Sequence, residues 1–259
     1  MPLTPFQADI FKIIAQNRSP ASYVAGGTAL HARNEGARFS DDIDIFHDLE
    51  EALLKSITRD EQSLTKAGYQ VKWLMNQKSF HRAIIEKSDL SIKVEWAKDS
   101  AFRFFPIIED PKMGFRLHDA DLATNKVLAC AGRSESRDFF DVLHLDKNYL
   151  PLGAMVWAAC GKDEGYTPDL ILDQMSRNLK FRHEDFESFE LSQPVDLKAI
   201  KRQWIDALSK AREFINVLPP ETVGSLFLFA GKPIAPQKGI LNGCQIHQGA
   251  IHGAWPVLI

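Results

Sequence analysis

Two aspartates, Asp42 and Asp44, are the residues of this sequence best placed to do chemistry. They stand in an apolar run, and alternate side chains of a strand share one face, so their carboxylates would be neighbours. A third carboxylate, Glu95, lies on the polar face of a later alternating run. Carboxylates from adjacent strands can hold two magnesium ions, one activating an attacking hydroxyl and one neutralising a leaving pyrophosphate. The pattern predicts metal-dependent nucleotidyl transfer.

The acid pair also has a plainer interpretation. Taken alone, an Asp-x-Asp pair can cap a loop or face water at the end of a strand. Its context favours chemistry, because Gly26 and Gly27 precede it, followed by Thr28 and a short helical run. A glycine pair lets the backbone approach a phosphate, and N–H groups at such a turn bind anions. The alternative for this segment is a simple tight turn that leads into a helix.

Alternating apolar runs, as in strands, occur up to about residue 118, and beyond it apolar residues recur at helical spacing. This change predicts that the chain has two structural parts. The first part should contain helices over 5–17, 28–35 and 49–66, and strands over 22–25, around the acid pair, and over 69–75, 80–86 and 90–97. The second should contain helices near 119–131, 136–147, 151–160, 168–179 and 196–217. Thr4 and Asp196 are expected as N-caps, and Asp48 with Glu51 resembles a capping box.

We therefore predict an α/β (α+β) fold in two domains. Residues 1–110 should form a mixed sheet with flanking helices that carries the acids. Residues 111–259 should be mainly helical, with an irregular C-terminal tail. The net charge of −3 gives no whole-domain basic signature of nucleic-acid binding.

Cysteine usage and hydropathy predict a cytoplasmic protein. The three cysteines lie far apart and have no CxxC partner, so neither a disulfide framework nor a zinc site is indicated. No signal peptide and no run of 18 apolar residues is seen, so we expect no contact with the membrane.

Four motifs together resemble the nucleotidyltransferase superfamily, in particular the AbiEii/AbiGii toxin type. The first is the Gly26–Leu30 turn, followed by the Arg38–Phe46 segment that contains the acid pair. A Lys-x-Asp element of that family corresponds here to Lys93-Val94-Glu95, in which the carboxylate is longer by one methylene. An Asp-x4-Lys helix corresponds to Asp121–Lys126, and an Arg-Asp-x-x-Asp element to Arg137–Asp141.

The resemblance implies a role for each matching residue. Asp42, Asp44 and Glu95 would be the catalytic metal ligands, with Asp44 as the bridging one. Gly26, Gly27 and Thr28 would hold the β and γ phosphates of a nucleotide, and Lys126 would place its ammonium against the triphosphate. Asp138 and Asp141 would form or support the nucleotide site, and Arg38 and Ser40 would position the metal-bearing strand.

Two of these motifs have a structural alternative. Lys126 could be an ordinary exposed helix lysine, and Arg137 with Asp141 could be only an intrahelical ion pair at i, i+4.

The same resemblance implies a nucleotidyltransferase-like sheet and a helical domain that closes one side of the active cleft. The implied reaction moves a nucleoside monophosphate from an NTP to a hydroxyl acceptor, with tRNA as the expected acceptor. Two Mg²⁺ ions are expected, with Mn²⁺ as the alternative metal. The resemblance also implies a toxin role and a protein antitoxin as a partner.

Two rival functions stay open. A non-catalytic nucleotide-binding or interaction protein could retain the fold, and the glutamate at position 95 is the sequence feature that supports it. A metal-dependent glycosyltransferase also uses an Asp-x-Asp on a strand, but ordinarily has a longer nucleotide-sugar-binding region upstream of it.

Overall fold

The computed structural model describes residues 3–32, 38–133, 135–186, 191, 196–237, 241 and 243–257. The chain divides into two compact units. The first unit comprises Met1–Ala101, Pro106–His118 and Phe189–Ser192. The second comprises Phe102–Phe105, Asp119–Ser188 and Gln193–Ile259. The division lies after His118 rather than at residue 110, because residues 106–118 add strands to the first unit's sheet.

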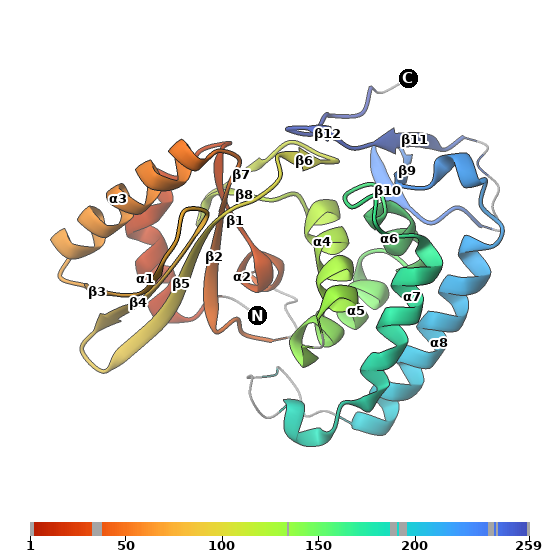
Figure 1. Cartoon of the computed structure of the whole chain (residues 1–259), viewed down its shortest axis with the longest axis horizontal. Helices are drawn as coiled ribbons and strands as arrows, with labels where there is room; N and C mark the ends of the chain where they lie inside the picture. The colour runs from red at the N-terminus through yellow and green to blue at the C-terminus, as the bar shows by residue number, and fades with distance from the viewer. Residues whose placement is uncertain are drawn as a thin grey trace. The chain divides into compact units, whose positions relative to one another are not determined.

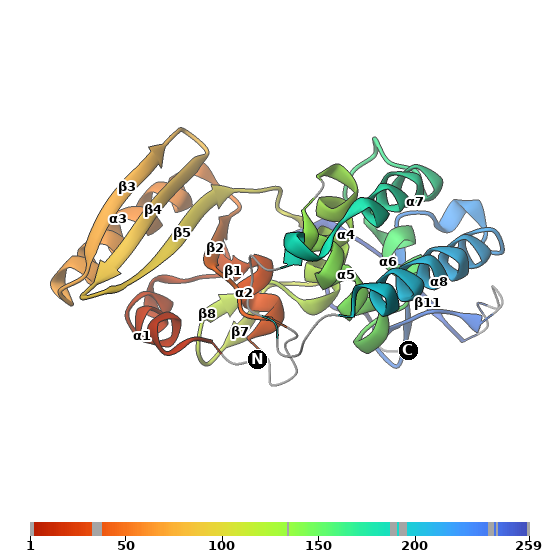
Figure 2. The same cartoon turned by 90° about the horizontal axis from the view of Figure 1, so that it is seen from below.

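A seven-stranded mixed sheet forms the centre of the first unit, in the order β3-β4-β5-β2-β1-β8-β7. The strands are β1 (Ser22–Ala25), β2 (Asp42–His47), β3 (Gln70–Asn76), β4 (Phe80–Lys87), β5 (Leu90–Lys98), β7 (Ile108–Asp110) and β8 (Gly114–Arg116). β2 runs parallel to β5, and β1 runs parallel to β8, while the other neighbours are antiparallel. Figure 2 shows β3, β4 and β5 side by side, with α3 behind them.

Three helices flank this sheet: α1 (Pro5–Ile14), α2 (Gly26–His31) and α3 (Glu50–Lys66). α1 and α3 pack together on one face, whereas α2 lies against β1 and β2 on the other (Figure 1). Ile43 and Ile45 of β2 are fully buried, as their alternation with the aspartates predicts. The polar face of β2 is therefore the face that α2 shares.

The N-terminal caps of α1 and α3 differ from each other. Thr4 caps α1 as predicted, in a capping box with Gln7, which stabilises the first turn. The predicted capping box of Asp48 and Glu51 is wrong, because α3 starts after Leu49 and has no side-chain cap. β2 extends to His47, and the Asp48 backbone N–H still bonds to the Ala21 carbonyl, which leaves Asp48 too early to cap the helix.

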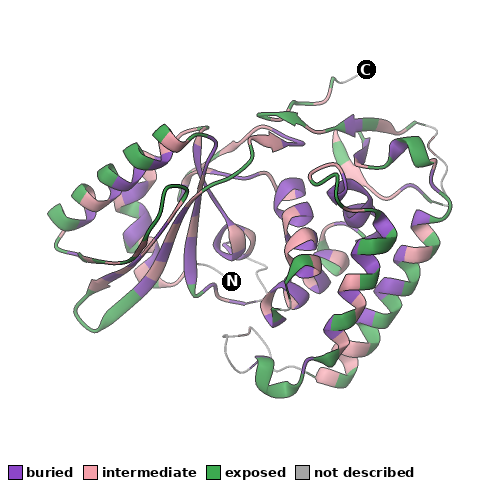
Figure 3. Cartoon of the chain, viewed as in Figure 1, coloured by how far each residue is buried: buried purple, intermediate pink, exposed green. Residues whose placement is uncertain are grey.

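Helices dominate the second unit. They are α4 (Asp119–Gly132), α5 (Ser136–Asn148), α6 (Leu152–Ala159), α7 (Pro168–Ser176) and α8 (Leu197–Ile215). α6 is buried along its whole length and packs against α4, α8 and β9 (Figure 3). α8 has one buried stripe, which includes Trp204, Leu208 and Ala211, and Asp196 caps its start as predicted.

The sequence predicts an irregular C-terminal tail, but the structure has strands in this segment. β9 (Ser225–Phe229) is the centre of a three-stranded sheet with β10 (Lys232–Ile234) and β11 (Gln245–Gln248). β12 (Ala250–Ile251) pairs with β6 (Phe102–Arg103). Short strands separated by glycine and proline have no sustained period, which is why the sequence pattern missed them. No helix in the described ranges has the length and apolarity that crossing a membrane requires.

Candidate active site

The predicted acids meet on the polar face of β2 and β5. Asp42 lies opposite Lys93, and Asp44 lies opposite Glu95, in the parallel register of these two strands. On its other side Asp44 pairs with Ala25, the last residue of β1. Facing residues on adjacent strands have neighbouring side chains. The structure therefore places Asp42, Asp44 and Glu95 at neighbouring positions on one face of the sheet, beside the glycine turn that follows β1.

Two cations lie among these carboxylates. The Nζ atom of Lys93 is 3.1 Å from Oδ2 of Asp42 and 3.3 Å from Oε1 of Glu95. The Nε atom of Arg82, on β4, donates to Glu95 Oε1 at 2.8 Å. Burial lowers the pKa of Lys93, but the Asp42 and Glu95 carboxylates more than offset it, so its pKa lies above the ordinary value. The ammonium is therefore charged throughout the physiological pH range.

Only glycine fits at position 26, for two reasons: its backbone conformation and the closeness of the Asp44 side chain. Its φ is +62°, in the left-handed region that residues with a Cβ rarely adopt. A Cβ on Gly26 would lie 1.8 Å from Oδ2 of Asp44. The glycine turn and the acid strand are thus in direct contact through Gly26 and Asp44, which joins the predicted phosphate turn to the predicted metal ligands.

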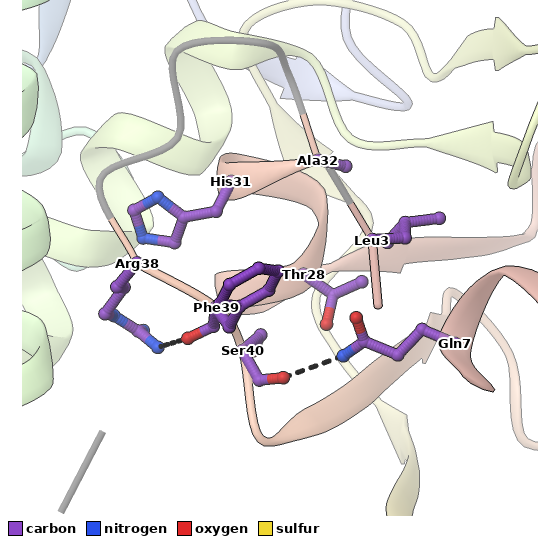
Figure 4. A pocket seen from close by; sticks show the side chains of 8 residues that line it. All are labelled: Leu3, Gln7, Thr28, His31, Ala32, Arg38, Phe39 and Ser40. Atoms are coloured by element: carbon purple, nitrogen blue, oxygen red, sulfur yellow. Dashed lines mark hydrogen bonds between the residues drawn. The ribbon is translucent and has the colours of Figure 1, made fainter. Parts of the chain in front are cut away.

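The segment that enters β2 is tied down by hydrogen bonds, two of which Figure 4 shows. Gln7 of α1 donates to the Ser40 carbonyl at 2.7 Å, and Arg38 donates to the Phe39 carbonyl at 2.9 Å. Ser40 then donates through Oγ to Oδ1 of Asp42 at 3.1 Å. These contacts fix the start of β2 and one oxygen of its first carboxylate.

Thr28 is buried, and its hydroxyl donates to the backbone carbonyl of Asp42. A hydroxyl has a single proton, and here that proton anchors α2 to β2.

The acid set fits a divalent cation by its chemistry. Hard carboxylate oxygens are the ligands that Mg²⁺ and Mn²⁺ prefer, and the Lys93 ammonium between Asp42 and Glu95 shows that the set stabilises positive charge. Within the described ranges, however, no three His, Cys, Asp or Glu side chains converge closely enough to hold one ion as they stand. Asp42, Asp44 and Glu95 are the residues that would hold it.

The predicted helix residues form a charge cluster inside the second unit. Lys126 Nζ lies 2.9 Å from Oδ1 of Asp138 and 2.8 Å from Oδ2 of Asp141. The Nε atom of Arg133 is 2.6 Å from the other oxygen of Asp138. Burial alone would raise the pKa of Asp138, but Lys126 and Arg133 bring it below the usual value. Lys126 is buried, so it is not the exposed helix lysine that the alternative describes.

Asp121, the first residue of the Asp-x4-Lys motif, is a third buried carboxylate of this unit. Asp121 accepts hydrogen bonds from the backbone N–H groups of Phe104 and Phe105, at 2.8 and 3.0 Å. Lys162 Nζ is 2.8 Å from its Oδ1 atom. Asp121 therefore fastens residues 102–105 to α4, which is a structural role.

Sequence reasoning did not single out Arg82 as a contact of Glu95, although a signal was present. A two-residue turn, Ser88-Asp89, joins the alternating runs of β4 and β5. Counting outward equally from such a turn places Arg82 opposite Glu95, which is the register that the structure has.

Known structures with a similar fold include one that is called a nucleotidyltransferase toxin by name. The nucleotidyltransferase toxin MenT4 of Mycobacterium tuberculosis H37Rv is similar with a TM-score of 0.59 and 16% identity, over 83% of each chain. JHP933 of Helicobacter pylori is similar with a TM-score of 0.52 and 19% identity, over 83% of this chain and 95% of that one. The fold is thus that of the nucleotidyltransferase class.

The family follows from the sequence. The model of the AbiEii nucleotidyl transferase toxins of type IV toxin–antitoxin (TA) systems matches residues 12–217, and the chain belongs to that family. A protein of Aquifex aeolicus (strain VF5), aq_aa25, is 33% identical over 134 residues, which is 49% of this chain. The match spans 58% of that relative's length.

Proposed function

We propose that this protein is a metal-dependent nucleotidyltransferase that moves a nucleoside monophosphate from an NTP to a hydroxyl acceptor and releases pyrophosphate. One observation carries the proposal: Asp42 and Asp44 alternate on β2, with Glu95 in register with Asp44 on β5 and Gly26 against the Asp44 carboxylate. Carboxylates next to a glycine turn that begins a helix are what this reaction requires. Family membership supports the same chemistry.

Nucleotidyltransferases generally use divalent metal ions. When bound, such an ion neutralises charge on the phosphates and lowers the pKa of an attacking hydroxyl. Asp42, Asp44 and Glu95 would hold two Mg²⁺ ions, with Asp44 shared between them. Ser40 keeps the Asp42 carboxylate oriented through its hydrogen bond. Ordered outer contacts of this kind typically matter by about 10- to 100-fold in metal affinity or activity.

The glycine turn would bind the phosphates of the NTP. Backbone N–H groups of Gly26 and Gly27 would meet the β and γ phosphates, because these residues begin α2 and the first N–H groups of a helix have no partner within it. Thr28 would act as the anchor of this turn, since its hydroxyl bonds to the carbonyl of Asp42.

In the second unit, Lys126 would place its ammonium against the triphosphate. Asp138 and Asp141 would position it, because each carboxylate pairs with its Nζ atom.

The biological role would be that of a growth-blocking toxin with a separate protein antitoxin. The family description names toxins of TA systems, and MenT4 is called a nucleotidyltransferase toxin. We propose RNA, and tRNA in particular, as the acceptor, because its terminal hydroxyls suit the reaction. Folds host many functions, so the acceptor has to be found by experiment.

A labelling assay tests the proposed function. Purified protein is incubated with each of the four α-labelled NTPs, Mg²⁺, and either total RNA or total protein. We expect label to enter one fraction, and to be lost in the Asp44→Asn variant. Asp89→Asn is the matched control, because Asp89 is an exposed residue of the turn between β4 and β5. If no fraction takes up label while the wild type binds metal, nucleotidyl transfer is contradicted.

One observation favours a second candidate, a non-catalytic nucleotide-binding protein. Lys93 and Arg82 pair with two of the three carboxylates, an arrangement that could persist in a protein without catalysis. This candidate predicts that the wild type binds NTP without releasing pyrophosphate. Labelling by the wild type and by Asp89→Asn, with loss of label only in Asp44→Asn, would exclude this candidate.

A further inference from the structure

Glu95 stands at a position where the resembling motif has aspartate, and its longer side chain has a partner on the neighbouring strand. Arg82 lies directly opposite Glu95 in the antiparallel register of β4 and β5. Its Nε atom donates to Oε1 of Glu95 at 2.8 Å, and Lys93 approaches the same oxygen at 3.3 Å. The hydrogen bond from Arg82 and the closest approaches of both cations all involve this same oxygen, Oε1.

Arg82 is itself held in place. Its guanidinium lies over the ring of Phe80, with 5.2 Å from Cζ to the ring centroid. Phe80 precedes Arg82 by two residues on the same strand, so both side chains project from the same face of the sheet. A guanidinium stacked on a ring and bonded through Nε has little rotational freedom, and it keeps its charge at every physiological pH.

We propose that Arg82 is a positioning residue for the metal site, which compensates for the extra methylene of Glu95. A glutamate side chain has one more rotatable bond than aspartate, so ordering its carboxylate costs more conformational entropy. Arg82 and Lys93 offset that cost by fixing Oε1, and the ordered carboxylate would then be ready to bind the metal. The inference rests on the proposed function, because it takes Glu95 as a metal ligand.

The sign of the change in metal affinity on removing Arg82 distinguishes this role from simple charge balance. If Arg82 were only a counter-ion, its removal would strip a repulsive charge from the site, and a divalent cation would bind more tightly. If Arg82 positions Glu95, its removal frees the carboxylate, and the cation binds more weakly. Metal affinity therefore separates the two roles without any enzymatic assay.

The experiment measures Mn²⁺ binding to the full, nucleotide-free chain by electron paramagnetic resonance of free Mn²⁺. We expect Arg82→Gln to raise the Kd for Mn²⁺ about 10-fold, within the range typical of contacts that orient metal ligands. Arg82→Lys should raise it less, because a cation remains but its Nζ atom is not placed like Nε. Lys72→Gln is the matched control, since Lys72 pairs with Glu86 at 2.6 Å in the same sheet; its Kd should equal that of the wild type.

A double variant tests whether Arg82 acts through Glu95. In a Glu95→Gln background, Arg82→Gln should change the Kd by less than about 2-fold, because the interaction is already gone. If Arg82→Gln raises the Kd by the same factor with and without Glu95→Gln, the proposal is overturned. An unchanged or lower Kd for Arg82→Gln alone would also overturn it. Should Arg82→Gln fail to fold by circular dichroism, Arg82→Lys decides, and a wild-type Kd there overturns the proposal. Absence of Mn²⁺ binding by the wild type would instead contradict the metal-dependent function itself.

Discussion

The ammonium of Lys93 lies 3.1 Å from the carboxylate of Asp42, directly across the parallel pairing of β2 and β5. It also reaches Glu95, at 3.3 Å. A half-buried lysine thus neutralises part of a cluster of acids that would otherwise repel one another. A bound divalent cation would reduce the repulsion between these carboxylates in the same way as the lysine ammonium does.

Lys93→Met should lower the melting temperature of the metal-free protein and increase its stabilisation by Mn²⁺. Without the ammonium, Asp42 and Glu95 lose a charged partner worth about 1 kcal/mol, which corresponds to about 2–4 °C in a chain of this size. Thermal unfolding with and without Mn²⁺ measures both effects. Lys98→Met, at the exposed end of the same strand, is the control. An Mn²⁺-induced rise no larger than that of the wild type would contradict the prediction.

Gly26→Ala should destabilise the first unit and abolish transfer. The left-handed backbone costs a residue with a Cβ about 1–2 kcal/mol, and the new methyl would in addition displace Asp44. Gly68→Ala is a matched control, because Gly68 also has a positive φ, +81°, but nothing lies within 4 Å of a Cβ there. Urea unfolding should show a larger loss for Gly26→Ala, with activity retained only in Gly68→Ala. Equal losses and equal activities would mean that contact with Asp44 is unimportant.

Lys126→Met should cost about 3–5 kcal/mol of unfolding free energy, the usual penalty for breaking a buried ion pair by removing one member. Asp138 and Asp141 are both fully buried, and Lys126 pairs with each. Denaturant unfolding measures the loss. The control is Lys147→Met on the exposed side of α5, which should stay within about 0.5 kcal/mol of the wild type. A similarly small change for Lys126→Met would show that the carboxylates find other partners.

His47 should make the protein less stable as the pH falls below about 6.5, the ordinary pKa of histidine. Burial, together with the nearby Arg18 charge, lowers the pKa of His47 to about 3 in the folded protein. Between these values the unfolded chain binds a proton that the folded one does not, so the unfolding free energy falls by up to about 1.4 kcal/mol per pH unit.

Urea unfolding at several pH values between 4 and 7 checks this. His47→Gln should have a flatter pH profile than the wild type, whereas His183→Gln, an exposed histidine, should not. Parallel profiles for the wild type and His47→Gln would assign the pH dependence to other groups.

The sequence predicted the part of the site that depends on local alternation. Period two on β2 placed Asp42 and Asp44 on one face with Ile43 and Ile45 in the core, and the structure confirms it. The fold class was also predictable, because a family resemblance spread over four motifs is more specific than any single one. The similarity to MenT4 agrees with it.

Other features depend on contacts between distant segments, which local patterns do not encode. The ion pair of Arg82 with Glu95 needs the register of β4 and β5, and β8 joins the first unit by pairing with β1. The burial of Lys126 depends on how α4 packs against α5, since its helix alone does not distinguish an exposed lysine from a buried one. Asp48 failed as a cap because β2 is longer than its apolar run.

The most direct test of metal-dependent nucleotidyl transfer is to count pyrophosphate against incorporated label in one reaction. With the NTP and acceptor found by labelling, the wild type should release one pyrophosphate per nucleotide transferred, and EDTA should stop both. Asp44→Asn should lower both rates at least about 100-fold, which corresponds to losing about 3 kcal/mol of charge stabilisation, while Asp89→Asn should match the wild type. Binding of NTP by the wild type without pyrophosphate release, or full activity in Asp44→Asn, would contradict the account.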